Sequence, residues 1–139
     1  TFRGNQLAMK AGTVVLNRVS KPEFLADVSR KGDLIRSKLE ELKSKVSIIG
    51  DVRGKGLMIG TEFVDPNGQA DCIGSLPTGG DIAAKVQKIC FENGLMVEKG
   101  GRNGSVMRCL CALNITDKDL AKAFAIFEKA VLAVDKEYK

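Results

Sequence analysis

The chain has 139 residues, 44% hydrophobic and 28% charged, which is the balance of one soluble globular domain with its own core. Its net charge of +5 comes from basic residues that are mostly interleaved with acidic ones, and aromatic residues make up only 5%. The sequence has neither the run of about 20 apolar residues that a membrane span needs nor the clustered basic or stacking aromatic residues of a nucleic-acid interface.

Two helices are predicted at the start of the chain. Residues 6–19 fit a helix, although the β-branched run of residues 13–15 blurs the period. Residues 23–45 fit a helix better, because apolar residues recur at three- and four-residue steps with charges between them. Ser20 and Glu23 have the spacing of a capping box, and Pro22 suits a first helical turn.

Glycine recurs at short intervals in the middle of the chain. The pattern Gly54-x-Gly56-x-x-x-Gly60 lacks the spacing of a dinucleotide-binding loop and precedes its strand instead of following one. We interpret these glycines as turns at the entry to a strand over residues 57–64. Residues 65–80 then form a long loop that is rich in Gly and Pro.

The last third alternates helices and short strands. We predict a helix over 81–93 that ends at Gly94, a strand over 95–98, a hairpin-like turn over 100–104, a strand over 105–113, and a final helix over 117–136 capped by Thr116. The last two strands should pair antiparallel. The predicted fold class is α+β, a small and mostly antiparallel sheet of three or four strands covered by helices on one face.

One charged residue, Arg108, interrupts the apolar strand over residues 105–113. A guanidinium in the middle of a strand is costly unless it faces water or meets an anion. Its planar fork of donors matches a carboxylate in bidentate geometry. Arg108 is therefore either a solvated strand residue or the carboxylate clamp of a small-molecule site.

Other polar residues give weaker signals. Thr1, Arg3 and Asn5 precede a predicted helix, where backbone N–H groups could hold a phosphate or the side chains could simply cap the helix. Lys55 and Lys99 are flanked by glycines, and we interpret both as solvated.

The chain contains no histidine, which excludes Ser-His and Cys-His nucleophile pairs, His general bases and zinc sites built on His. Its cysteines form no C-x-x-C pair, so we expect reduced, mostly buried thiols in a cytoplasmic protein. Cys109 and Cys111 lie two apart in a predicted strand and should point to the same face. They should fill the core and not act as nucleophiles, because no base is available. We expect no metal site.

Three stretches, in order, resemble the class III pyridoxal-phosphate-dependent aminotransferases. TFRGNQLAM, residues 1–9, resembles the family's T-[FY]-x-G-N-x-L-A segment, and DVRGKGLMIGTEF, residues 51–63, resembles its V-R-G-x-G-L-M-x-G-x-E strand. Residues 93–95 and the Arg108 strand followed by LNIT resemble the C-terminal N-G-L…R-x-x-P-P-L-x-I-[TS] pattern. Within the family, residues 1–6 and 100–104 look most like diaminobutyrate:2-oxoglutarate aminotransferases.

The resemblance implies roles for particular residues. The threonine at the Thr1 position binds the phosphate of pyridoxal 5'-phosphate across a homodimer interface. The arginine at the Arg108 position holds a substrate carboxylate, and the stretch around Arg53 is mainly structural. The family has two prolines where this chain has Cys111 and Ala112, which leaves the exact presentation of Arg108 open.

The resemblance also implies that the Schiff-base lysine lies upstream of Thr1, in a large domain outside this sequence. We therefore expect residues 1–22 to lead from that domain, residues 23–139 to form the C-terminal small domain, and the piece alone to be inactive. The complete enzyme would move an amino group between a diamino acid and 2-oxoglutarate. The alternative is a non-catalytic module of the same fold that binds a carboxylate metabolite through Arg108.

Overall fold

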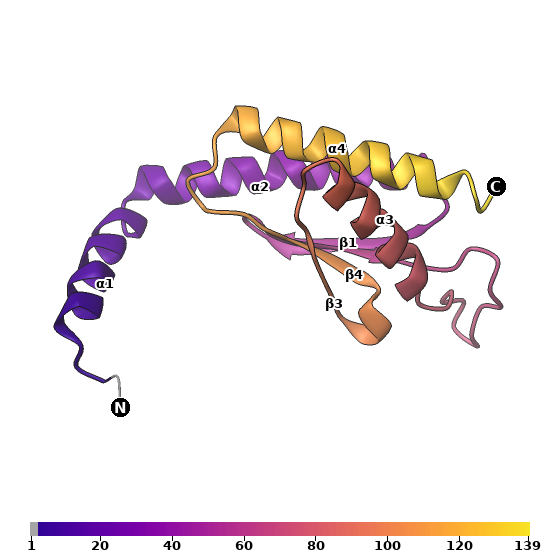
Figure 1. The fold of residues 1–139 in the computed structure, drawn as a ribbon, viewed down its shortest axis with the longest axis horizontal. Coiled ribbons are helices and arrows are strands. Elements are labelled where there is room, and N and C mark those ends of the chain that lie inside the picture. The colour runs from indigo at the N-terminus through magenta and orange to yellow at the C-terminus, as the bar shows by residue number, and fades with distance from the viewer. Residues whose placement is uncertain (1–2) are drawn as a thin grey trace.

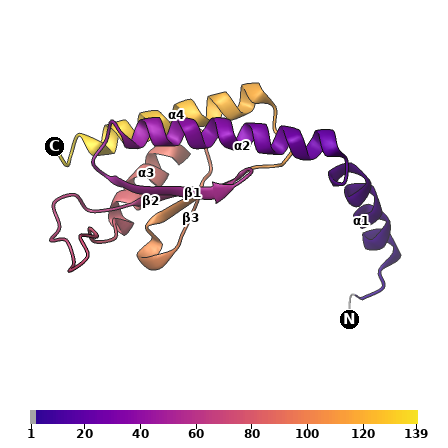
Figure 2. The ribbon, with the colours of Figure 1, turned by 180° about the vertical axis from the view of Figure 1, so that it is seen from behind.

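The structure is a computed structural model that describes residues 3–139. Its elements are α1 (Gln6–Val19), α2 (Pro22–Lys43), β1 (Ile49–Lys55), β2 (Met58–Phe63), α3 (Gly80–Glu92), β3 (Glu98–Gly100), the 3-10 turn η1 (Arg102–Gly104), β4 (Val106–Leu110) and α4 (Asp117–Asp135). The four strands form one antiparallel sheet in the order β1-β2-β4-β3. In Figure 1, α2 and α4 run side by side over one face of this sheet, and Figure 2 shows the same layer from behind. The predicted α+β fold is confirmed.

The core lies between the sheet and the helices. Ile59, Thr61 and Phe63 alternate along β2 and are buried, as the period of two in a strand requires. The helices contribute their apolar stripes, which are Ile35, Leu39 and Leu42 of α2, Ile82, Val86 and Cys90 of α3, and Leu120, Val131 and Val134 of α4. Each fully buried large side chain of this kind stabilises the fold by about 1.5–3 kcal/mol.

Several helix ends follow the predicted signals. Asn5 caps α1, because its Oδ1 accepts hydrogen bonds from the Leu7 and Ala8 N–H groups, and Thr116 caps α4 through the Asp119 N–H. Gly94 has a φ of 83° and ends α3 in a Schellman turn, in which the Leu95 N–H donates to the Cys90 carbonyl at 2.8 Å.

The predicted capping box at Ser20 is wrong. Its Oγ donates to the Leu16 carbonyl at 2.7 Å, so Ser20 closes α1 instead of opening α2. Helix α2 begins at Pro22 with Lys21 as an N-cap that makes no side-chain hydrogen bond. Because the connection between α1 and α2 is short, the serine hydroxyl can reach the last turn of α1.

The strand β1 was not predicted, because its glycines and charges hide the alternation. Only Ile49 and Val52 within it are buried. The glycines do turn the chain, since Gly54 (φ 152°) lies next to the end of β1 and Gly56 (φ 55°) lies in the β1–β2 connection. A Cβ on Gly54 would lie 2.1 Å from the Met58 carbonyl oxygen, a spacing that excludes any side chain there.

The strand predicted over residues 95–98 begins only at Glu98, where pairing with Arg108 starts. The reason is that the Leu95 N–H is occupied by the α3 cap. The long connection from β2 to α3 has no regular structure, as predicted, and its ends are joined by the Asp65 N–H, which donates to the Pro77 carbonyl at 2.9 Å.

Helix α1 stands apart from the layered body of the molecule. None of its residues is buried, and Leu7, Met9 and Leu16 are 82%, 63% and 62% exposed. Figure 1 shows it leading away from the end of α2 and from the sheet. Within residues 3–139, none of the helices combines the length and apolar character needed to cross a membrane.

Candidate functional site

A row of residues crosses the sheet on the face opposite α2 and α4. In the strand register, Arg53 of β1 lies opposite Gly60 of β2, Gly60 opposite Arg108 of β4, and Arg108 opposite Glu98 of β3. Residues that lie directly opposite one another share a face of the sheet. Gly60 has no side chain, and the Val106 side chain lies against it, 3.1 Å from where a Cβ would stand.

Arg108 uses its Nη2 in a hydrogen bond, whereas its Nε has no partner among the described residues. Its Nη2 donates to Oε1 of Glu98 at 2.5 Å, and both side chains are partly exposed, 39% for Arg108 and 46% for Glu98. Among the described residues, its Nε is buried and has no hydrogen-bond partner. A buried donor without a partner costs about 1–3 kcal/mol. The part of Arg108 that an anion could reach is the partly exposed guanidinium end, where Glu98 is the carboxylate partner among the described residues.

Arg53 differs from Arg108 because two carboxylates already hold it. Its Nη1 donates to Asp51 at 2.7 Å and to Glu62 at 2.5 Å. The hydrogen bond to Asp51 is the main reason that the pKa of Arg53 is raised, and the same bond lowers the pKa of the Asp51 carboxyl. Of the two arginines in the row, Arg53 is held by two carboxylates and Arg108 by one.

The turn that precedes β4 makes room for the Arg108 side chain. A Cβ on Gly100 would lie 3.3 Å from Nη2 of Arg108, so a side chain there would crowd the guanidinium. Asn103 adopts a positive φ of 55° and donates from Nδ2 to Thr78 Oγ1 at 2.9 Å. The glycine-rich hairpin predicted over residues 100–104 therefore shapes the surroundings of Arg108.

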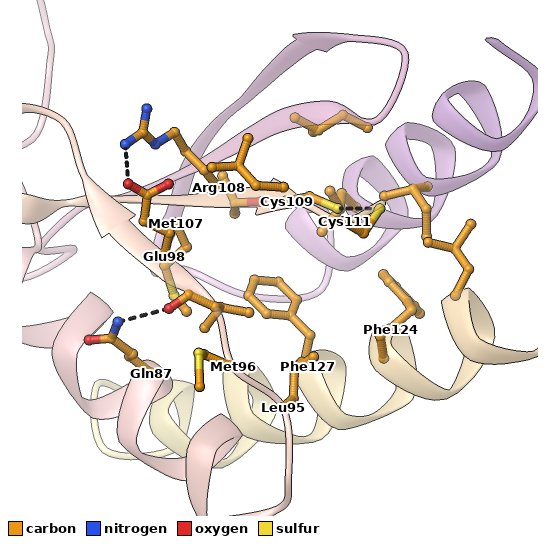
Figure 3. A pocket seen from close by; sticks show the side chains of 18 of the residues that line it. Gln87, Leu95, Met96, Glu98, Met107, Arg108, Cys109, Cys111, Phe124 and Phe127 are labelled. Carbon is orange, nitrogen blue, oxygen red and sulfur yellow. Dashed lines mark hydrogen bonds and ion pairs between the residues drawn. The ribbon is translucent and has the colours of Figure 1, made fainter. Parts of the chain in front are cut away.

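An apolar cavity of about 650 Å³ lies against the same strand, between the sheet and the helices. Figure 3 shows Phe124 and Phe127 on the side of the β4 ribbon away from the Arg108 guanidinium, which points toward Glu98. Cys109 and Cys111 form part of the cavity wall, with their Sγ atoms 3.8 Å apart. The prediction that these two cysteines share a face is confirmed.

The expectation of mostly buried thiols holds fully only for Cys90. Cys109 and Cys111 are half-buried, and Cys72 is exposed in the β2–α3 loop. Burial raises the pKa of the Cys90 thiol to about 11, so it stays protonated at neutral pH. Cys90 thus behaves as a small apolar core residue, as predicted.

A buried lysine, Lys31, escaped the sequence analysis. It is 6% exposed, and its Nζ donates to Asp27 at 2.5 Å and to the Ile115 carbonyl at 2.7 Å. Its spacing could have revealed it, because Lys31 precedes Ile35 and Leu39 at four-residue steps and so continues the apolar stripe of α2. By contrast, Lys55 is exposed, as predicted, and Lys99 is half-buried.

Residues 1–131 match the family Aminotransferase class-III, so the chain belongs to the class III aminotransferases. It is 39% identical to the diaminobutyrate–2-oxoglutarate aminotransferase of Haemophilus influenzae over 132 residues, which cover 95% of this chain and 29% of that protein. It is 36% identical to the mitochondrial acetylornithine aminotransferase of Saccharomyces cerevisiae over 135 residues, 96% of this chain and 28% of that protein. The predicted family is confirmed, and the chain spans less than a third of these relatives.

A solved structure with the same fold is a phospholyase from Arthrobacter in complex with phosphoethanolamine. It matches with a TM-score of 0.77 at 20% identity, over 88% of this chain and 28% of that one. The similarity at this identity concerns the fold alone.

Class III aminotransferases depend on pyridoxal phosphate. Lys31, the buried lysine among residues 3–139, is not free to anchor that group, because its amine is held by Asp27 and the Ile115 carbonyl. Thr1, the predicted phosphate contact, lies outside the described residues. Arg108 is the predicted site residue whose geometry is visible.

Proposed function

We propose that this chain is the C-terminal part of an aminotransferase that moves an amino group between a diamino acid, 2,4-diaminobutyrate, and 2-oxoglutarate. The partly exposed guanidinium of Arg108, held by Glu98 alone among the described residues, is the observation that carries the proposal. Both substrates carry carboxylates, and a guanidinium binds a carboxylate most strongly through two parallel hydrogen bonds. The identity to the Haemophilus influenzae enzyme supports the choice of donor.

Glu98 gives the proposed clamp a resting partner. Its carboxylate occupies the Nη2 donor and leaves the Nε donor free. An incoming substrate carboxylate could replace Glu98 at the partly exposed end of the guanidinium. The exchange costs little free energy, because a half-exposed ion pair contributes at most about 1 kcal/mol.

In the proposed arrangement, residues 1–22 lead from a large domain and residues 23–139 form the small domain. The exposed apolar side chains of α1 support this division, because such a helix needs a covering surface. The complete protein would be a cytoplasmic homodimer in which Thr1 contacts the cofactor phosphate of the other subunit. Pyridoxal phosphate supplies the electron sink for amino transfer once a lysine anchors it. That lysine would lie outside this chain, which would be inactive alone.

The test is an assay of the complete protein, expressed from a reading frame extended upstream of Thr1. It is supplied with pyridoxal phosphate, 2-oxoglutarate and one donor at a time: 2,4-diaminobutyrate, ornithine or N-acetylornithine. We expect glutamate to form fastest with 2,4-diaminobutyrate. Preference for N-acetylornithine would overturn the assignment of 2,4-diaminobutyrate as the amino donor. Acetylornithine aminotransferases are also similar to this chain. No turnover with any donor, together with binding of 2-oxoglutarate, would favour the non-catalytic module.

A further inference from the structure

Two thiols face the apolar cavity behind the Arg108 strand. The Sγ atoms of Cys109 and Cys111 lie 3.8 Å apart, and both residues line the cavity. Figure 3 shows the pair at one end of the cavity, with a dashed line joining the two sulfurs. The proposed aminotransferase function makes no use of either thiol.

The spacing of the sulfurs suits chelation of one metal ion. A metal–thiolate bond is about 2.3 Å long, so one ion can reach two sulfurs that are up to about 4.6 Å apart. The measured separation of 3.8 Å falls inside that limit without movement of the strand. Cys109 is the next-to-last residue of β4 and Cys111 follows its end, so the strand fixes one ligand and the adjoining segment presents the other.

The number of ligands selects the kind of ion. Among residues 3–139, no group of three or more His, Cys, Asp or Glu side chains could hold a metal. Zinc sites normally use three or four protein ligands, so a pair of thiols would hold zinc weakly. Soft thiolates favour monovalent copper, for which two ligands suffice. The apolar walls also disfavour hard, strongly hydrated ions.

We propose that Cys109 and Cys111 form a dithiolate site for one monovalent copper ion at the wall of the apolar cavity. Each thiol loses its proton as its sulfur binds, so two protons are released and the oxidation state of copper does not change. The bound unit carries one net negative charge.

The experiment titrates the reduced 139-residue chain with copper(I) under anaerobic conditions against the competing chelator bicinchoninate. We expect one ion per chain and a sulfur-to-copper absorption in the ultraviolet. Cys109→Ser and Cys111→Ser should each weaken binding by roughly 100-fold or more, because chelation is lost. Cys72→Ser, at an exposed cysteine outside the cavity, should bind like the parent chain.

Circular dichroism spectra of all variants establish that they fold. Copper binding that survives in a folded Cys109→Ser or Cys111→Ser variant, or that is lost in Cys72→Ser, would overturn the proposal. A parallel titration with zinc should show weaker binding, and tighter zinc binding would contradict a two-ligand copper site.

Discussion

Glu98 holds Arg108 through a hydrogen bond of 2.5 Å across the ladder between β3 and β4. The two residues are directly paired in the strand register, so the backbone places the carboxylate next to the guanidinium. The bond occupies Nη2, and the neighbouring buried Nε has no partner among the described residues. The pairing predicts that substitutions of Arg108 and of Glu98 change the KM for 2-oxoglutarate in opposite directions.

Arg108→Lys in the complete enzyme should weaken the use of both 2-oxoglutarate and the amino donor. Lysine keeps the charge but loses the planar fork. A hydrogen bond to a charged group contributes about 1.5–3 kcal/mol, so KM should rise by roughly 10- to 100-fold. Steady-state kinetics with each substrate varied in turn measures the effect. Arg53→Lys is the matched control, and equal kinetics for Arg108→Lys and the parent enzyme would rule out the clamp.

Glu98→Gln should lower the KM for 2-oxoglutarate. The substitution removes a carboxylate that competes with the substrate for Nη2, and a half-exposed ion pair of up to about 1 kcal/mol corresponds to a two- to fivefold change. The control is Glu62→Gln, which removes a partner of Arg53 instead. A higher KM in Glu98→Gln would mean that Glu98 positions the guanidinium and does not compete with the substrate.

Gly54→Ala and Gly12→Ala should change stability in different directions. Gly54 has a φ of 152°, and a Cβ there would meet the Met58 carbonyl oxygen at 2.1 Å. We expect a loss of about 3 kcal/mol or more in the free energy of unfolding. Gly12 lies inside α1 with nothing within 4 Å of an added Cβ, so alanine should raise helicity and leave or increase stability. Urea denaturation with circular dichroism compares the two variants.

Asp135→Asn should destabilise the fold in a pH-dependent way. Asp135 is 1% exposed and accepts hydrogen bonds from the Ser47 N–H at 2.7 Å and the Ser47 Oγ at 3.0 Å. Burial alone would raise its pKa, but Lys139 and the Ser47 donors outweigh burial and bring the pKa below its ordinary value of 3.8. A lowered pKa means that the stabilisation is present above the unfolded-state pKa of about 3.9 and is lost as the pH falls through the folded-state value.

Urea midpoints from pH 7 down to pH 3 test this expectation. At pH 7 the variant should lose about 1–3 kcal/mol relative to the parent chain, and the difference should shrink below about pH 4. Asp33→Asn is the control, because Asp33 forms a surface ion pair with Arg36 and is 69% exposed. A constant gap at every pH would assign the effect to packing and not to the ionised carboxylate.

The 139-residue chain should not anchor pyridoxal phosphate on any single lysine. Among the described residues, the buried amine is Lys31, and Asp27 and the Ile115 carbonyl already hold it. After incubation with pyridoxal phosphate and reduction with borohydride, peptide mapping should find only scattered, substoichiometric labelling. The complete protein provides the positive control. One lysine of residues 1–139 labelled in full would refute the inactive-fragment proposal.

The sequence predicted the elements whose signals are local. The period of α2, the Gly94 turn and the Thr116 cap each depend on a few neighbouring residues, and the structure confirms them. Strand β1 was missed because Gly50, Asp51 and Arg53 break the apolar alternation, and pairing with β2 supplies what the local pattern lacks.

The candidate site shows the same division between local and long-range information. Arg108 was identifiable as a charge in an apolar run. Its pairing with Glu98 and its free Nε depend on the strand register and on side-chain packing, which no spacing rule contains. The burial of Lys31 likewise depends on Ile115, which is 84 residues away along the chain.

Arg108 and Cys109 are adjacent in β4, and their side chains project to opposite faces of the sheet. A displacement imposed on Cys109 from the cavity would therefore also move the backbone that carries Arg108. Substitutions that overfill the cavity should thus appear as altered carboxylate recognition on the opposite side, even though they never touch the substrate.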